Sequence, residues 1–377
     1  MLNPSKIALS TLITIKIFIG AAVLFNACLF MSCSEEVVII NTEDFDPPRY
    51  NWRAMVINDY GFSDLWAQDT NKVFLLNHND KSLNIISGGN IEEHYVGEYG
   101  LDKIQGLSNN EVYIFGSTWF PDNRLSIIKW NGGGFEYYHT EIILSTAKGI
   151  KGLAVNSNEI WIISLKGICK YDGNGLIYYT HPDSQLIPTS LFLYNNNKVQ
   201  YIAGKYVDPE NIQQCLFEFR DTGFVRIYNY IGNPNINMTY TFLNEIGGFK
   251  YGLELKQPLN TDWSICMHYF SGSSFMPYFC FNGKIHTTWA TWSNNPVGFN
   301  LQSFIILVET DRNVFDTTRI GILHWNGSAV SKELQLSPRT GPFDSSILYS
   351  VNSNCYLILE PRNRIEVNCI LYFGTIK

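Results

Sequence analysis

The chain has 377 residues, of which 45% are hydrophobic, 15% aromatic and only 16% charged. Such a chain is long enough for two average domains or one large all-β domain, and it can build a sizeable core. The formal net charge is −7, and no cluster of lysines and arginines offsets it. This balance excludes a basic surface for nucleic acids, because a duplex would repel the protein.

Residues 1–32 differ in composition from the rest of the chain. They begin with a short basic start at Lys6, continue as a long apolar run broken only by Lys16, and contain no Asp or Glu. This pattern is typical of an export signal. An uncleaved signal anchor is an alternative, because the apolar run exceeds the roughly 20 residues that span a bilayer. Plain secretion is a second alternative.

The signal-like segment ends in LFMSC, which places the small residue Ser32 before Cys33. This ending resembles the signal of bacterial lipoproteins, in which the cysteine becomes the lipidated N-terminus. Phe30 departs from that pattern, because the family usually has leucine there, and Cys28 in FNAC is the alternative lipidation site. The SEE triplet that follows Cys33 resembles the export tag of Bacteroidetes surface lipoproteins. The resemblance implies an outer-membrane lipoprotein at the cell surface, with the membrane as a partner through the lipid.

The segment 33–48 is acidic and ends in Pro-Pro. It is expected to be a tether between the lipid and the folded part of the chain. The sequence thus predicts a signal peptide over 1–32, a tether over 33–48 and a folded domain over 49–377.

An aromatic residue followed by a Gly/Asn-rich turn recurs along the folded domain, and the residue five positions after it is apolar. The clear copies pair Trp130 with Phe135, Tyr171 with Leu176, Phe219 with Phe224, Phe270 with Phe275, and Trp325 with Val330. A degenerate copy joins Ile86 to Ile91, and a last one begins at Tyr372. Each copy predicts a β-hairpin.

A second hairpin precedes most of these turns, as in IQGLSNNEVYIFG and LFLYNNNKVQYIAG, so a unit holds four strands. The units recur every 41–55 residues, which is the period of β-propeller blades. The resemblance to β-propeller repeats covers nearly all of residues 50–377, and it extends loosely to the ydG-type units of bacterial exported proteins. The sequence therefore predicts an all-β, seven-bladed propeller of four-stranded antiparallel blades, with six or eight blades as alternatives.

The last unit ends at Lys377, shortly after its third strand. Near the other end of the domain, YNWRAMVIND reads as a strand without a hairpin partner nearby. We therefore expect Arg53–Ile57 to be the outer strand of the last blade, which closes the ring.

Six cysteines remain beyond the signal, and two pairs lie 14 positions apart around hairpin turns. Cys266 with Cys280, and Cys355 with Cys369, are candidates for disulfides in an oxidising location. The alternative is free thiols buried in strands. No CxxC motif is present, so a zinc site is not expected.

Long loops are expected on one face of the propeller, where strand two joins strand three and where blade joins blade. Binding usually resides on such loops. The candidates for ligand binding are Trp119, Asp122, Asp208, Asp262, Trp263, Asp311, Trp289 and Trp292. The alternative is that each Trp packs between blades and each Asp caps a turn. Asp311, Asn313 and Asp316 lack the glycine hinge and terminal Glu of a calcium loop, and neither a metal nor a cofactor is expected.

No GxSxG, HExxH or P-loop motif is present, and no catalytic residue is assigned. His268 and His324 precede the repeated aromatic, where other units have lysine, and we expect them to face solvent. The leading hypothesis is a monomeric, non-catalytic propeller that binds a glycan or a partner protein on its long-loop face. The alternatives are an exported polysaccharide hydrolase or lyase, and a structural subunit of an envelope complex.

Overall fold

The computed structural model describes residues 38–41, 47–59, 61–118, 122–143, 150–194, 198–206, 212–231, 240–246, 249–256, 264–270, 275–282, 297–300, 303–312, 318–335, 347–352, 354–361 and 369–377. Residues 39–377 form one compact unit, which is described here by itself. The predicted signal peptide and Cys33 lie outside the described residues. Within the described ranges, no helix is long and apolar enough to cross a membrane.

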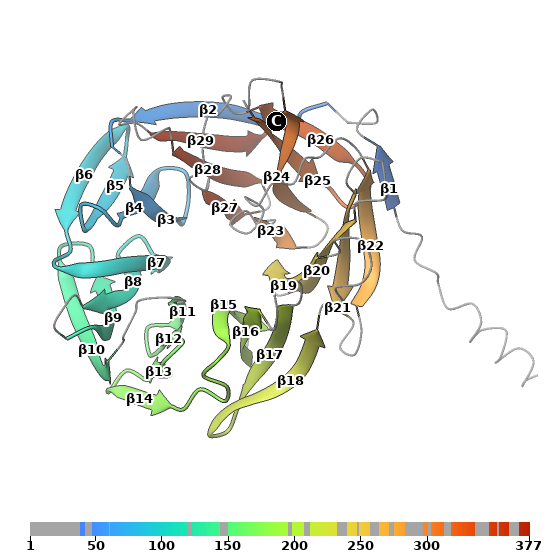
Figure 1. The fold of residues 1–377 in the computed structure, drawn as a ribbon. Coiled ribbons are helices and arrows are strands. Elements are labelled where there is room, and N and C mark those ends of the chain that lie inside the picture. Colours follow the sequence, from blue (N-terminus) through green and yellow to red (C-terminus); the bar gives the residue numbers. More distant parts are fainter. Residues whose placement is uncertain are drawn as a thin grey trace, which may run out of the picture. The chain divides into compact units, whose positions relative to one another are not determined.

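The described strands form seven sheets, six with four strands and one with five. The sheets follow one another around a common centre (Figure 1). Within each sheet the pairings among the four strands of the repeat are antiparallel. This arrangement confirms the predicted all-β propeller. Each sheet is called a blade and is numbered in chain order from the sheet that contains β3.

The strands of each blade are given from the innermost outwards. Blade 1 consists of β3 (Phe62–Ala67), β4 (Lys72–Asn77), β5 (Ser82–Ser87) and β6 (Asn90–Tyr95). Blade 2 consists of β7 (Tyr99–Ser108), β8 (Glu111–Thr118), β9 (Arg124–Trp130) and β10 (Phe135–Ile143), and blade 3 of β11 (Lys151–Asn156), β12 (Glu159–Ser164), β13 (Gly167–Tyr171) and β14 (Leu176–Tyr179). Blades 4 and 5 consist of β15 (Ile187–Tyr194), β16 (Lys198–Tyr206), β17 (Ile212–Arg220) and β18 (Gly223–Ile231); and β19 (Tyr240–Ile246), β20 (Phe249–Lys256), β21 (Ser264–Phe270) and β22 (Phe275–Asn282). Blades 6 and 7 consist of β23 (Val297–Asn300), β24 (Ser303–Arg312), β25 (Thr318–Trp325) and β26 (Val330–Gln335); and β27 (Ile347–Asn352), β28 (Cys355–Pro361), β29 (Cys369–Ile376) and β2 (Tyr50–Ile57).

The fifth strand of blade 5 is β1 (Val38–Asn41), which lies beside β22 in the strand order of that sheet. This short strand falls within the segment 33–48, for which the sequence predicts a tether.

The predicted hairpins are confirmed at the level of single residue pairs. In the first six copies of the motif the anchor lies directly opposite the residue five positions later; the pairs are Ile86–Ile91, Trp130–Phe135, Tyr171–Leu176, Phe219–Phe224, Phe270–Phe275 and Trp325–Val330. The last copy differs, because Tyr372 lies opposite Ala54 of the N-terminal strand β2. The repeated motif is therefore the turn between the third and fourth strands of a blade.

The turns of blades 2, 3 and 6 share one hydrogen-bond pattern. The Asn or Asp after the anchor uses Oδ1 to accept hydrogen bonds from the backbone N–H groups two and three residues later, at 2.9–3.1 Å. The next residue is glycine in each case, with a φ of 92° at Gly132, 89° at Gly173 and 91° at Gly327. Side chains other than glycine rarely adopt this conformation, which explains the recurring WNG and YDG outline.

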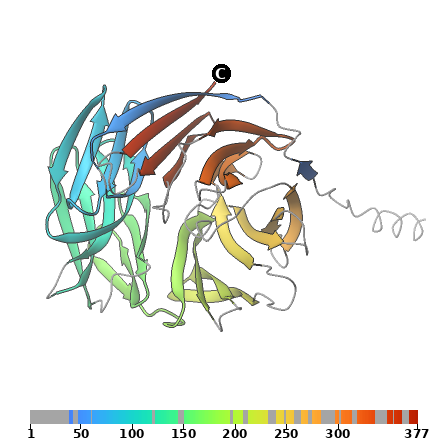
Figure 2. The same cartoon turned by 45° about the horizontal axis from the view of Figure 1, so that its top comes forward.

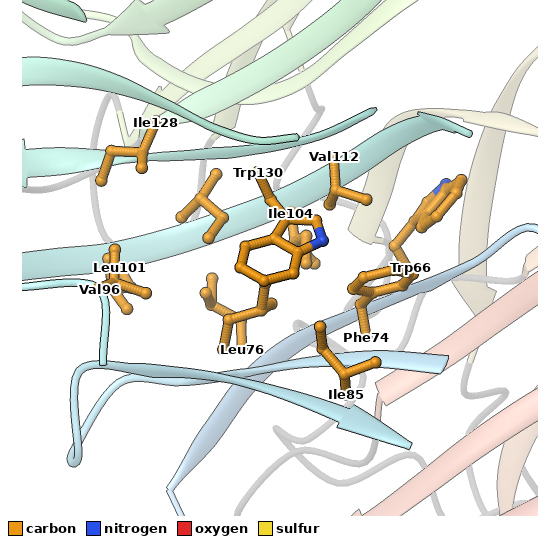
Figure 3. Close-up of a cluster of buried hydrophobic side chains, with 12 residues drawn as sticks. Trp66, Phe74, Leu76, Ile85, Val96, Leu101, Ile104, Val112, Ile128 and Trp130 are labelled. Atoms are coloured by element: carbon orange, nitrogen blue, oxygen red, sulfur yellow. The ribbon is translucent and has the colours of Figure 1, made fainter. Parts of the chain in front are cut away.

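The core is divided into layers that lie between neighbouring blades. Phe74 of β4 packs in one buried cluster with Trp130 of blade 2 (Figure 3), whereas its neighbour Leu75 packs in another with Leu357 of blade 7. Further clusters lie between blades 2 and 3, 3 and 4, and 6 and 7. Successive residues of an interior strand thus face opposite blades, which is why these strands are apolar on both faces.

The N-terminal strand closes the ring as predicted. Strand β2 pairs with β29 over its whole length, from Tyr50 opposite Ile376 to Ile57 opposite Cys369. Figure 2 shows the blue β2 running along the red strands of blade 7. The Arg53 guanidinium also lies over the Phe373 ring, 4.8 Å from its centroid, which adds a cation–π contact to the pairing.

A buried carboxylate of blade 6 holds the start of this closing strand. Glu333 in β26 is only 6% exposed. Its Oε1 accepts a hydrogen bond from Arg49 N at 3.0 Å, and its Oε2 accepts one from Tyr50 N at 3.0 Å. Hydrogen bonds to an ionised acceptor are stronger than neutral ones, so Glu333 fixes the position at which the chain enters blade 7.

The expectation that His324 faces solvent is wrong. This side chain is 3% exposed and lies between the rings of Tyr50 and Tyr356, at the contact between blades 6 and 7. Burial lowers the pKa of His324 to about 4. The strand position before the repeated aromatic accepts different side chains because each blade places a different partner beside it. Lys129 Nζ lies 3.0 Å from Glu111 Oε1, whereas His324 Nε2 lies 3.3 Å from Ser303 Oγ.

Glu333→Ala is expected to lower the free energy of unfolding by about 2–3 kcal/mol, because two backbone N–H groups lose a charged acceptor. Urea denaturation of the variant and the parent protein measures this difference. Glu92→Ala is the matched control, since the Glu92 side chain is 71% exposed on an outer strand, and it should change stability by less than about 0.5 kcal/mol. Equal stability of Glu333→Ala and the parent would show that closure does not depend on this carboxylate.

Candidate functional site

The connections between strands are all short on one face of the propeller, whereas the other face carries both short connections and all the long ones. The short face carries the turns between strands one and two and between strands three and four, which span at most four residues. The opposite face, called the long-loop face, carries segments such as 257–263, 283–296 and 336–346. The predicted asymmetry of loop length is therefore confirmed by the strand boundaries.

Two of the predicted ligand-binding residues lie in the described part of the chain. Asp122 is exposed in the turn between β8 and β9 of blade 2. Asp311 lies in β24 of blade 6, opposite Arg319, so these two aspartates belong to separate blades. The remaining candidates lie outside the described residues and stay predictions; they are Trp119, Asp208, Asp262, Trp263, Trp289 and Trp292.

The two predicted disulfides differ in outcome. Cys266 lies directly opposite Cys280 in the register of β21 and β22, and a disulfide between them stays a prediction. The prediction of a disulfide between Cys355 and Cys369 is wrong, because Cys355 is a free, buried thiol. The register places Cys355 opposite Thr375 and Cys369 opposite Pro361, so the two thiols lie near opposite ends of their strand pair.

An exposed group of aromatic rings lies where the chain passes from blade 1 to blade 2, at the long-loop ends of β6 and β7. This aromatic patch consists of Tyr95, Tyr99, Tyr137 and His139. The Tyr99 ring is stacked on that of Tyr137, with centroids 5.6 Å apart, and on that of His139, with centroids 5.7 Å apart. Tyr95 is 58% exposed and Tyr137 is 43% exposed, so the patch offers ring surface to solvent.

The connection between the blades positions Tyr99. Tyr99 N donates a hydrogen bond to Gly97 O at 2.8 Å, which makes a tight turn. Gly97 has a φ of 116°, and a Cβ atom on it would meet the Tyr99 ring at 2.8 Å. Only glycine therefore allows the ring to lie over β10. The Tyr137 hydroxyl donates to Val96 O at 2.9 Å and ties the patch to the same turn.

Hydrogen bonds also fix the imidazole of His139. Ser126 Oγ donates to Arg124 O at 3.3 Å and therefore accepts from His139 Nδ1, which lies 3.1 Å away. The other ring nitrogen, Nε2, is left to accept from the Tyr99 hydroxyl at 3.4 Å. Burial, and next to it the charge of Arg124, lowers the pKa of His139. The patch is thus uncharged at neutral pH.

A second group of polar residues lies on the inner strands, where they begin at the long-loop face. Asp64 of β3 is 5% exposed, forms an ion pair with Lys103 Nζ at 2.8 Å, and accepts a hydrogen bond from Ile104 N at 2.9 Å. Through its Oδ2 atom this carboxylate joins blade 1 to blade 2. Asp102 of β7 and Lys151 of β11 complete the group, called the inner polar group.

Asp102 occupies a β-bulge that recurs near the start of other inner strands. The register of β3 shifts around Ser63, that of β7 around Asp102, and that of β15 around Thr189. In β3 and β15 the bulged hydroxyl donates to a carbonyl of the second strand, at 3.3 Å in both blades. An ionised carboxyl cannot donate in this way, and Asp102 Oδ2 is buried without a hydrogen-bond partner among the described residues.

The surroundings of Asp102 favour its neutral form. Burial raises the pKa of Asp102 to about 6, and the nearby charges of His78 and Lys151 oppose this rise. Burial likewise lowers the pKa of Lys151, and the charge of Lys103 adds to that effect. Among the described residues, the Lys151 ammonium makes no hydrogen bond or ion pair. Two titratable side chains at the inner strand ends thus lack direct partners.

Sequence reasoning did not find either group. The aromatic patch combines Tyr99 of an inner strand with two residues of an outer strand, and no motif joins these positions. The alternation of Tyr137 and His139 along FEYYHT was the available signal, since it places both side chains on one face of β10. In the described residues, no group of His, Cys, Asp and Glu could hold a metal ion.

Among comparisons with known proteins, one solved structure supports the fold. No protein-family model and no curated protein sequence matches the chain. A solved structure of a streptogramin B lyase is similar with a TM-score of 0.52 and 15% identity, and the match covers 87% of this chain and 98% of that one. The chain is a β-propeller. A β-propeller domain of the trilobed protease from Pyrococcus furiosus has a TM-score of 0.48 and 8% identity, over 84% of this chain and 95% of that one. At these identities the likeness concerns the fold alone.

Asp102→Asn is expected to raise the free energy of unfolding at pH 7.5 by about 2 kcal/mol, because it removes a charge that burial disfavours. The folded-state pKa of about 6 lies above the ordinary value of 3.8. Between these values the folded state binds more protons, so the parent protein loses stability as the pH rises from about 4 to about 6. The advantage of Asn should therefore vanish near pH 4.

Urea denaturation at pH 4, 5, 6 and 7.5 measures this difference. Asp122→Asn, at an exposed turn of the same blade, is the control and should leave the pH profile unchanged. If Asp102→Asn changed the free energy of unfolding equally at pH 4 and pH 7.5, the raised pKa of Asp102 would be contradicted.

Proposed function

We propose that this chain is a lipid-anchored, extracytoplasmic β-propeller that binds a glycan on its long-loop face and catalyses no reaction. The aromatic patch is the observation that carries this proposal. Aromatic ring faces pack against the C–H faces of sugar rings, and the hydroxyl and imidazole groups at their edges bind sugar hydroxyls. A patch that is uncharged and exposed suits a neutral carbohydrate.

The fixed geometry of the patch also supports binding. Tyr99, Tyr137 and His139 are held by hydrogen bonds to one another or to the backbone. Tyr95 donates a hydrogen bond to Glu98 Oε1 at 2.6 Å, and Glu98 in turn pairs with Lys81. Side chains that are already ordered lose little conformational entropy when a ligand binds. A pre-ordered aromatic surface is therefore better suited to a ligand than mobile side chains would be.

The proposed location outside the cytoplasm rests on the sequence of residues 1–33. The apolar signal-like segment, the small residue before Cys33 and the acidic triplet after it support export and lipidation. Membrane attachment through the lipid would present the propeller outside the cytoplasm, where glycans of the cell envelope and the surroundings are available.

Asp102 favours a second candidate function, that of an exported polysaccharide hydrolase or lyase. A carboxyl with a pKa near 6 can act as a general acid at neutral pH. Glycoside hydrolysis requires a second carboxyl about 5–10 Å from the first. Asp64 is the other described carboxyl of the inner polar group, and it is bound to Lys103 and Ile104. A non-catalytic role is therefore favoured.

A glycan array probed with the protein lacking residues 1–33 tests the binding proposal, and we expect neutral glycans among the hits. Tyr137→Ala should weaken binding to the best hit by tenfold or more, because each 1.4 kcal/mol of lost contact changes affinity about tenfold. Tyr178→Ala is the matched control, since Tyr178 is 42% exposed on the outer strand of blade 3, and it should bind as the parent does.

Absence of any sugar binding, together with co-purification of an envelope protein, would contradict the glycan proposal and favour a protein ligand. Release of reducing ends from a bound glycan, lost in Asp102→Asn, would contradict the non-catalytic role and favour the hydrolase.

Lipidation is tested with radiolabelled palmitate in a bacterial host that processes lipoproteins. The full chain should take up label and partition with the membrane fraction, and Cys33→Ser should lose both properties. Cys28→Ser is the control and should retain them. Labelling that survives Cys33→Ser but not Cys28→Ser would move the lipidation site to Cys28.

A further inference from the structure

The face of blade 2 that carries the aromatic patch ends in an arginine. In the register of β9 and β10, Ile128 lies opposite Tyr137, and Ser126 lies opposite His139. Side chains two positions apart on a strand point to the same side of the sheet. Arg124, two residues before Ser126, therefore lies on the face of the patch, at its long-loop end.

Two further observations place Arg124 beside His139. Ser126 Oγ links the two residues, since it donates a hydrogen bond to Arg124 O at 3.3 Å and lies 3.1 Å from His139 Nδ1. Burial lowers the pKa of His139, and the positive charge of Arg124 adds to that effect. The charge of an exposed side chain is felt only over about 10 Å in physiological salt, so the guanidinium lies near the imidazole.

The guanidinium of Arg124 is free to meet a ligand. Arg124 is exposed, and within the described ranges its hydrogen bonds are made by its backbone N–H and carbonyl groups alone. Asp122, in the same turn, is exposed and forms no ion pair with it. The acidic residue at the other end of the patch, Glu98, already pairs with Lys81. Arg124 therefore offers its five N–H donors to a ligand of opposite charge.

The combination of aromatic rings and one arginine defines the ligand that fits best. Arginine binds a carboxylate through two parallel hydrogen bonds, which are stronger than hydrogen bonds between neutral groups. A uronic acid carries its carboxylate at the edge of a sugar ring and keeps the C–H faces of that ring. Such a unit can stack on the patch while its carboxylate meets the guanidinium. A neutral sugar makes the first of these contacts alone.

We infer that the aromatic patch and Arg124 together form a binding site for glycans that contain uronic acid, in which the rings hold the sugar faces and Arg124 binds the carboxylate. This inference rests on the proposed glycan-binding function and narrows it, because neutral glycans bind through the rings alone and uronate-containing glycans bind more tightly. The net charge of −7 repels acidic polymers from the protein as a whole. The preference for uronates thus depends on a local contact.

The test uses isothermal titration of the protein lacking residues 1–33 with matched pairs of oligosaccharides. Oligogalacturonate and oligomannuronate are each compared with the same compound after chemical reduction of its carboxyl groups, which keeps ring number and linkage. In at least one pair the uronate should bind tenfold or more tightly than its reduced form. Arg124→Gln should abolish this preference by weakening uronate binding, with no change for the reduced form.

Two variants serve as controls for charge and geometry. Arg220→Gln removes the same charge from an exposed position on blade 4, where Arg220 pairs with Glu218, and it should keep the preference. Arg124→Lys should keep part of it, because lysine retains the charge but not the two parallel hydrogen bonds. The melting temperature of all three variants should match that of the parent.

The outcomes separate this inference from the function on which it rests. If the parent protein binds no probe and no array glycan, the glycan function fails and the inference fails with it. If Tyr137→Ala weakens the binding of a neutral glycan, but the parent does not prefer any uronate to its reduced form, the inference alone is overturned. A preference that survives Arg124→Gln would overturn it too, because another cation would then bind the carboxylate. Equal weakening of both members of a pair by Arg124→Gln would show that Arg124 supports the patch instead of binding the carboxylate.

Discussion

Each interior sheet of this protein must bury both of its faces, and the rest of the structure depends on that constraint. Phe74 and Leu75 follow each other on β4 and pack against different neighbouring blades. A single blade would expose two apolar faces to water, so its stability comes from its neighbours. A closed ring is the arrangement in which every blade has two neighbours, and the pairing of β2 with β29 joins strands from the two ends of the chain within that ring.

The sequence predicted much of this fold because its signals are local. The anchor residues and the turn glycines lie within a few positions of one another, and a hairpin turn fixes the register of its two strands. The closing strand was predicted by a different argument. The N-terminal strand β2 had no nearby hairpin partner and the last blade lacked a fourth strand, so β2 was expected to complete that blade. The environment of His324 was not predicted, because the same position of a blade is polar for reasons that differ between blades. Lys129 forms a half-buried ion pair with Glu111, whereas His324 lies between two tyrosines and beside the closing strand.

The candidate site was predicted less well than the fold. Loop length correctly indicated the long-loop face, but most of the chosen Trp and Asp residues lie outside the described part of the chain. The aromatic patch and the inner polar group depend on contacts between blades, as between Tyr137 and Val96 or between Asp64 and Ile104. Such contacts join residues about 40 positions apart and follow from ring geometry, so a motif search cannot find them. Asp102 could be recognised as unusual only when its bulge was compared with those at Ser63 and Thr189.

Blade 7 combines strands from both ends of the chain, and this has a consequence for how the protein folds. During synthesis β2 emerges first among the strands of blade 7, and its partner β29 emerges after the other strands of that blade. Until Cys369–Ile376 emerges, β2 has no strand to pair with, and the apolar clusters between blade 7 and its two neighbours lack the residues of β29. A chain that lacks these residues cannot close blade 7 with β2, and it leaves apolar surface exposed on both sides of that blade. Loss of Cys369–Ile376 would therefore expose apolar surface to proteases and chaperones, although these residues form only one strand of the molecule.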